Sequence, residues 1–191
     1  LTSVKDKNNR AAVFTPFALP CNIDFEKMES EDFQQFHFEL LPATYQKLAT
    51  QQPEAYQGAW DLWQIGIAKG YLKPQFHGRE HLNLNVFNDK LKKRDEALLT
   101  ALKNKSYTSI SDDDYPTMSS TAAFDFWDVK ENESLAVMIE EGLQLFEKVY
   151  GYPSTYCTPP VYNIHHSLFR TLYKNGIRFI DLGLVRNEHQ G

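Results

Sequence analysis

The chain has 191 residues, of which 42% are hydrophobic and 14% aromatic, and it carries a formal net charge of −5 at pH 7. This length fits a single domain over residues 1–191, with enough apolar side chains to fill a sizeable core. The negative charge argues against nucleic acid or an anionic membrane as the main partner, and because no apolar run of about 18 residues occurs, we expect no transmembrane helix.

The first half of the chain predicts two strands with helices between them. Continuous apolar residues at the start of the first strand indicate burial on both faces, and Pro16 should mark its exit because proline cannot donate to a central ladder. In chain order, the patterns predict a strand at 10–19, a loop at 20–22, a helical segment from 24 broken at Pro42 and resuming at 43–52, a helix at 53–70 and a strand at 72–76.

The second half continues the alternation of helices and strands. Its clearest helix has Ser134 as a candidate N-cap and Gly151 as its stop. A long loop before that helix carries Asp112, Asp113 and Asp114, which either bind a cation or form a solvated acidic turn. The patterns predict a helix at 84–103, a loop at 105–121, a helix at 132–150, a strand at 154–158, a helix at 164–175 and a strand at 177–184.

This alternation predicts an α/β fold with a parallel sheet and helices on its faces. Ligands of such sheets bind at the carboxyl ends of the strands, so the loops that follow the strands should share one rim. We therefore expect residues that are distant in the sequence to converge there, namely Cys21, His77, His81, Pro159 and Tyr162.

The candidate chemical centre is the segment His77-Gly78-Arg79-Glu80-His81, which directly follows the second strand. Neutral imidazole is the commonest metal ligand. Two imidazoles four residues apart can face one ion if the segment turns helically, and a catalytic zinc site then needs a third protein ligand. The competing interpretation is a chance spacing of two solvent-exposed histidines.

Several segments together resemble one enzyme family. They are the string Phe76-His77-Gly78-Arg79-Glu80-His81, Arg10 to Phe14, Phe146 to Gly151 followed by Tyr156 to Pro160, and Leu172 to Ile177. In their order and spacing, they resemble motifs of the NodB-type polysaccharide deacetylases, the family-four carbohydrate esterases. The resemblance is closest to a divergent bacterial branch, and it implies a parallel-sheet deformed (β/α) barrel, incomplete over these residues.

The resemblance implies a hydrolase of carbohydrate metabolism that removes N- or O-acetyl groups from a polysaccharide or a saccharide precursor with the help of a divalent metal, expected to be zinc. The residue roles that it implies are metal ligation by His77 and His81, lining of the acyl pocket by Pro159 and Tyr162, and orientation of the imidazoles by Arg79, Glu80 and Asn83.

The chain departs from the family pattern at several points. Gly78 stands where the family has a small hydroxyl residue, and Cys157 stands where it has arginine. The family's aspartate pair, which supplies a metal ligand and the base, is expected before residue 1, and its acid histidine is expected after residue 191. We therefore expect the domain to continue beyond both ends, with its catalytic base and acid outside this chain.

Two other functions stay open at this stage. A deacetylase-like domain without its aspartates would be a carbohydrate-binding module. The pattern His-x-x-Glu-His is also that of inverted zinc peptidases, with Glu80 as base, although that chemistry needs the motif inside a helix. We interpret the adjacent His165 and His166 as surface residues of a helix, because neighbours on a helix do not face the same way.

The two cysteines, Cys21 and Cys157, are too few for a disulfide framework. We expect reduced thiols, which favours a cytoplasmic location.

Overall fold

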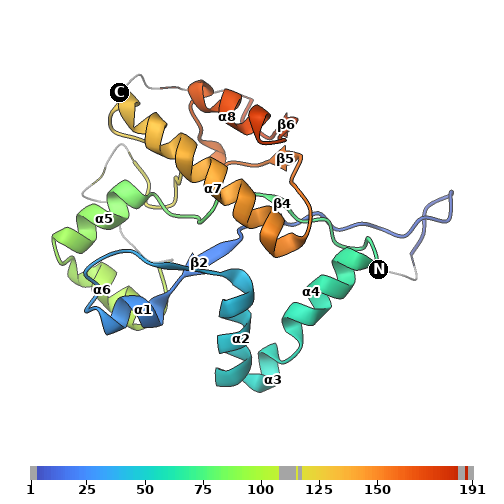
Figure 1. Ribbon diagram of the computed structural model, residues 1–191, viewed down its shortest axis with the longest axis horizontal. Coiled ribbons are helices and arrows are strands. Elements are labelled where there is room, and N and C mark those ends of the chain that lie inside the picture. The colour runs from blue at the N-terminus through green and yellow to red at the C-terminus, as the bar shows by residue number, and fades with distance from the viewer. Residues whose placement is uncertain (1–3, 108–114, 116–117, 185–187, 189–191) are drawn as a thin grey trace.

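The computed structural model of this chain describes residues 4–107, 115, 118–184 and 188, and Figure 1 shows its elements. The strands are β1 (Phe17–Ala18), β2 (Cys21–Ile23), β3 (Phe38–Leu40), β4 (Gln75–Phe76), β5 (Tyr156–Cys157) and β6 (Phe179–Ile180). The α-helices are α1 (Phe25–Ser30), α2 (Leu41–Gln51), α3 (Pro53–Tyr56), α4 (Ala59–Ala68), α5 (Leu84–Lys92), α6 (Glu96–Lys103), α7 (Asn132–Tyr150) and α8 (Phe169–Lys174). The described 3-10 helices are η1 (Val129–Glu131), η2 (Pro160–Tyr162) and η3 (His166–Leu168). Within these residues, no helix has both the length and the apolar character that crossing a membrane requires.

Four strands form one parallel sheet in the order β1-β4-β5-β6. In the register of this sheet, Phe17 lies opposite Gln75, Phe76 opposite Cys157, and Cys157 opposite Ile180. Helices connect these parallel strands, as the alternation in the sequence predicted. The α/β class is therefore confirmed. The described strands form an open sheet, and its closure into a deformed barrel stays a prediction.

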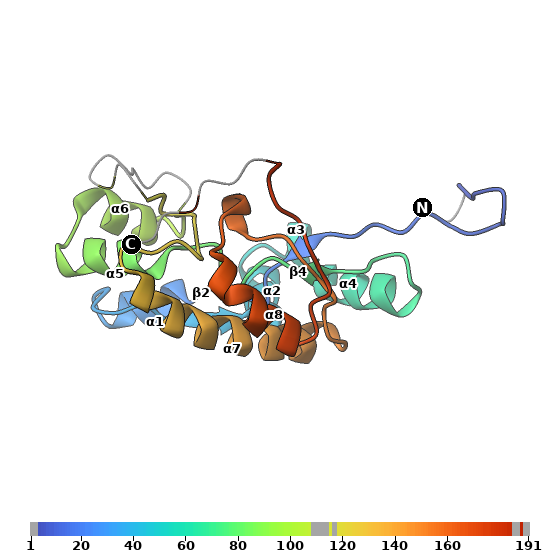
Figure 2. The same cartoon turned by 90° about the horizontal axis from the view of Figure 1, so that it is seen from above.

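Helix α7 packs on one face of the sheet, and Figure 2 shows α8 beside it on the same side. Phe76 of β4 is fully buried and meets the ring of Phe146 edge-on at 6.1 Å. Gly142 permits this approach, because an added Cβ would lie 3.1 Å from Phe76 Cζ. The predicted bounds of α7 and its stop at Gly151 (φ 83°) are confirmed. Ser134 is not its N-cap, since its hydroxyl donates to a carbonyl of the preceding turn.

The opposite face of the sheet carries a row of aromatic rings. The ring of Tyr156 lies between those of Phe17 and Phe179, at centroid distances of 5.7 and 6.3 Å. Phe17 is 44% exposed and Phe179 is 63% exposed. This face is therefore open to solvent within the described part of the chain, and the core lies between the other face and the helices.

The strand predicted at residues 10–19 is wrong in its length and in its burial. The one strand described within it is β1, beside isolated bridges from Ala11 to Lys5 (antiparallel) and from Phe14 to Leu72 (parallel). Phe14 is 58% exposed. Pro16 precedes β1 instead of marking its exit. Its carbonyl accepts the N–H of Gln75 at 2.9 Å, but it has no N–H to return, so the regular ladder begins after it.

Two helices predicted from periodicity are each divided by a left-handed residue. Gly58, with a φ of 74°, separates α3 from α4. Arg94, with a φ of 56°, separates α5 from α6. Asp95 then caps α6, because its carboxylate accepts the N–H of Leu98 at 2.7 Å. An apolar stripe continues across such a break, so the spacing of apolar residues does not reveal it.

Two further segments differ from their predictions. The predicted loop at residues 20–22 contains β2, which pairs antiparallel with β3 and places Cys21 opposite Leu40. Helix α8 begins at Phe169 instead of Ile164. The pairing of β2 with β3 joins two segments that are separated in the sequence, so the local spacing of apolar residues does not predict it.

Candidate metal centre

The histidine segment lies at the carboxyl rim of the sheet. The backbone N–H of His77 donates to the carbonyl of Ala18 at the end of β1, at 3.2 Å. On the other side, the N–H of Thr158 donates to the carbonyl of Phe76 at 3.1 Å. His77 is therefore held between the ends of β1 and β5, which is the edge where parallel sheets place their sites.

The rings of His77 and His81 lie close together, with centroids 4.9 Å apart and planes inclined by 55°. The segment between them is a bend and not a helix. Gly78 makes that bend with a φ of 115°, and a Cβ there would lie 3.0 Å from the carbonyl oxygen of Glu80. The expected helical turn is therefore wrong, and a glycine-dependent bend brings the imidazoles together.

One ring nitrogen of His77 is committed to the backbone. Its Nδ1–H donates to the carbonyl oxygen of Thr158 at 2.6 Å, which leaves the lone pair on Nε2. Burial, helped by the neighbouring His81, lowers the pKa of His77, and the Thr158 hydrogen bond opposes this effect only in part. A neutral imidazole with a fixed tautomer is the form that binds a metal.

The residues at this rim fit part of a zinc site. The two imidazoles supply two nitrogen ligands, and a catalytic zinc typically takes three protein ligands. Among the described residues, no third histidine, cysteine or carboxylate ligand atom joins them within 4.8 Å. The hydroxyl of Thr158 is buried and has no hydrogen-bond partner in the described part of the chain, so the site also holds an unsatisfied polar group.

Arg79 and Glu80 form a buried ion pair with each other. The guanidinium donates to Glu80 twice, at 2.6 and 2.9 Å, and a third bond from it reaches Glu141 on α7. Burial raises the pKa of Glu80, and the charge of Arg79 opposes that rise. The ring of Phe38 lies 4.6 Å from the guanidinium carbon. These two residues fasten the segment to the core, and the expected hydrogen bonds to the histidines are not found.

Asn83 also has a different role from the one expected. Its side-chain oxygen caps α5 by accepting the N–H groups of Asn85 and Val86. Its amide nitrogen donates to the carbonyls of Ala122 and Asp125, at 2.9 and 3.0 Å. Asn83 therefore holds the loop before η1 against α5 and does not orient an imidazole.

The loop after β5 meets the histidine segment, as the shared rim predicted. The ring of Pro160 would lie 3.6 Å from a Cβ at Gly78. Pro159 is buried, and its carbonyl accepts the N–H of Tyr162 at 2.9 Å. Tyr162 is 56% exposed and has a φ of 57°. A buried proline and an exposed tyrosine thus flank the rim.

Both cysteines are buried, free thiols. Burial, helped by the Glu80 charge, raises the pKa of Cys21 to about 12. Burial also raises the pKa of Cys157 to about 12. Among the described residues, neither cysteine sulfur joins the two imidazoles in a group of ligand atoms within 4.8 Å, so the geometry does not supply a cysteine as the third ligand.

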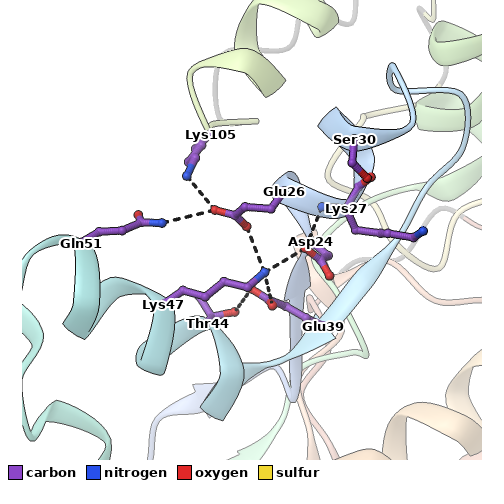
Figure 3. Close-up of polar contacts among 9 residues, drawn as sticks. All are labelled: Asp24, Glu26, Lys27, Ser30, Glu39, Thr44, Lys47, Gln51 and Lys105. Atoms are coloured by element: carbon purple, nitrogen blue, oxygen red, sulfur yellow. Dashed lines mark hydrogen bonds and ion pairs between the residues drawn. The ribbon is translucent and has the colours of Figure 1, made fainter.

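An acidic cluster that the sequence did not reveal is occupied by a lysine (Figure 3). Asp24, Glu26 and Glu39 bring carboxylate oxygens within 4.8 Å of one another. The ammonium of Lys47 lies 2.9, 3.0 and 2.6 Å from these three carboxylates in turn. The cluster is an ion-pair network that joins α1, β3 and α2. The acidic run at 112–114 lies outside the described residues.

The second group with metal-ligand geometry contains His165, His166 and Glu188. The expectation that these histidines lie on one helix and face apart is wrong. His165 is extended (ψ 143°) and 6% exposed, and its ring centroid lies 4.2 Å from that of His166. His165 precedes η3 and His166 is its first residue, so the two are not neighbours within one helix and the rule for helical neighbours does not apply.

Comparison of the chain with family models, with curated proteins and with solved structures gave no match. The interpretation of the site therefore rests on its geometry and chemistry.

Proposed function

We propose that this domain hydrolyses acetyl groups of a saccharide with the help of a divalent metal, zinc, held by His77 and His81. The observation that carries the proposal is the close pair of imidazoles, 4.9 Å apart at the carboxyl rim of a parallel sheet. The resemblance of the histidine segment to the NodB-type deacetylases supplies the substrate class.

His77 is prepared for a metal by its surroundings. The Thr158 carbonyl holds the proton on Nδ1, so Nε2 is the ligand atom. Zinc, when bound, would polarise an acetyl carbonyl and lower the pKa of a bound water. His81 completes the pair from the far side of the Gly78 bend. The catalytic base and acid are assigned to no residue of this chain.

The rim also supports a substrate-facing role for the loop after β5. Tyr162 projects a largely exposed ring, and Pro159 is buried beneath the same loop. An amphipathic ring of this kind can pack against a sugar or its acetyl group while its hydroxyl remains in water. We assign Pro159 and Tyr162 to the acyl pocket on this basis.

The peptidase alternative lacks support from the geometry. It requires Glu80 to face the metal as a base, but both carboxylate oxygens of Glu80 accept hydrogen bonds from Arg79. It also requires a helix through His77 and His81, where the chain forms a bend.

The test is zinc retention in His77→Ala and His81→Ala, followed by acetate release from an N-acetylated sugar oligomer. We expect each substitution to weaken zinc binding at this site by at least about tenfold. His37→Ala is the matched control, because His37 is also partly buried and contacts a carboxylate, Glu31, at 2.7 Å.

The outcomes separate the candidate functions. Zinc binding that does not change in either rim variant would reject the metal site. Weak zinc retention together with saccharide binding would favour the carbohydrate-binding module, whereas acetate release would exclude it.

A further inference from the structure

A second group of metal-ligand atoms forms around the turn before α8. One ring nitrogen each of His165 and His166 and one carboxylate oxygen of Glu188 lie within 4.8 Å of one another. Glu188 is distant in the sequence, and two of its contacts join it to His166. Its oxygens accept the backbone N–H of His166 at 3.0 Å and meet His166 Nδ1 at 2.7 Å.

The fold holds the two imidazoles side by side. His165 is buried, meets the ring of Phe126 edge-on at 5.4 Å, and has its Nδ1 2.8 Å from the hydroxyl of Ser167. His166 is exposed, with 59% of its side chain accessible, and Glu188 covers one edge of its ring. An ion can therefore reach the group from solvent while one of its ligands is anchored in the core.

We infer that His165, His166 and Glu188 form a further divalent-cation site, selective for zinc-like ions. Two imidazoles and a carboxylate are a ligand set that zinc uses in proteins, with a fourth position left for water. Hard cations such as magnesium and calcium prefer oxygen ligands and would bind this set weakly. The inference does not depend on the His77–His81 pair or on the proposed function.

His166 and Glu188 meet directly within this group, with His166 Nδ1 2.7 Å from a carboxylate oxygen. Ligands about 2 Å from one zinc ion lie no more than about 4 Å apart. The three ligand atoms, which lie within 4.8 Å of one another, therefore need only a small adjustment to bind one ion. The bound ion would join Glu188 to the turn at His165 and His166, so it should stabilise the fold.

The experiment measures zinc binding by calorimetry to untagged chain that carries His77→Ala and His81→Ala. Among the described residues, this leaves His165, His166 and Glu188 as the candidate group that contains histidine. We expect one bound zinc per chain and an increase of the melting temperature on zinc addition. Adding Glu188→Gln or His166→Ala should weaken binding by at least about tenfold and abolish the increase. Both substituted side chains are at least partly exposed, so the fold should survive them.

The control separates a metal site from a simple ion pair. His37 and Glu31 have the same 2.7 Å contact but no neighbouring second imidazole, so His37→Ala should leave zinc binding unchanged. The inference is overturned if the parent binds no zinc, if Glu188→Gln binds zinc as tightly as the parent, or if His37→Ala weakens binding equally. If the parent does not fold, the number of zinc ions bound per chain is measured for the chain that retains His77 and His81, with and without Glu188→Gln. The inference is overturned if Glu188→Gln does not change that number.

Discussion

The Nδ1–H of His77 donates a 2.6 Å hydrogen bond to the carbonyl oxygen of Thr158, which lies 81 residues further along the chain. This bond joins the end of β4 to the end of β5 and selects the tautomer of the ring. The candidate centre therefore depends on a contact between neighbouring strands as well as on the spacing of its two histidines.

The ionisation of His77 should reflect this environment. Burial lowers its pKa from the ordinary value of 6.5. Because the folded-state pKa is the lower one, the unfolded chain takes up a proton first as the pH falls. The contribution of His77 to stability is thus complete above about pH 6.5 and is lost below it.

A ring-proton NMR titration of metal-free protein checks this pH dependence. The His77 signal should titrate below pH 6.5 in the folded chain and near 6.5 in urea. A folded-state pKa at or above the urea value would contradict the proposed environment. Zinc binding should weaken over the same pH range, since protons compete for the ligand nitrogens.

Glu80→Gln should destabilise the fold by about 3–5 kcal/mol, because it leaves the buried Arg79 guanidinium with only the half-exposed Glu141 as a charged partner. Urea unfolding measures this change. Asp32→Asn is the control, since it removes the partner of Arg94 in an exposed pair and should cost less than about 1 kcal/mol. Equal losses of unfolding free energy in the two variants would show that the buried pair contributes no more to stability than the exposed pair.

Asn83→Ala should reduce stability by about 2–4 kcal/mol. The substitution removes the cap of α5 and also the amide that donates to the carbonyls of Ala122 and Asp125. Asp128→Ala, which removes only a side-chain cap, should cost about 1 kcal/mol. Thermal melts of both variants show whether the amide contacts of Asn83 contribute stability beyond that of the helix cap. An equal loss of stability in the two variants would mean that they contribute none.

Lys47→Met should make the free energy of unfolding depend less on pH in the acidic range. Burial by itself would raise the pKa of Glu26, but hydrogen bonds from Lys105 and Lys47 lower it to about 2, from an ordinary value of 4.5. Stability from this carboxylate is present above about pH 4.5 and is lost as the pH falls toward 2. Without Lys47 the folded-state pKa rises, so the slope of unfolding free energy against pH becomes smaller in this window.

Urea unfolding at several pH values between about 2 and 5 measures that slope. Lys69→Met, at the exposed end of α4, should leave the slope unchanged. A slope that Lys47→Met does not alter would show that the network in Figure 3 adds little to stability.

Features that depend on neighbouring residues could be predicted from the sequence. The bounds of α7, its stop at Gly151 and the alternation that gives a parallel sheet were all recognised in this way. The meeting of the loop after β5 with the histidine segment followed from the rule for strand ends, since Pro160 packs beside Gly78.

Contacts between distant segments were decided by the tertiary structure. The direction of Glu80 toward Arg79, the Thr158 bond to His77 and the approach of Glu188 to His166 have no local pattern that announces them. The sequence by itself indicated which residues are candidate metal ligands and that helices alternate with parallel strands. Packing decided which side chains face one another, because a hydrogen bond or ion pair forms only where the folded backbone brings both partners together.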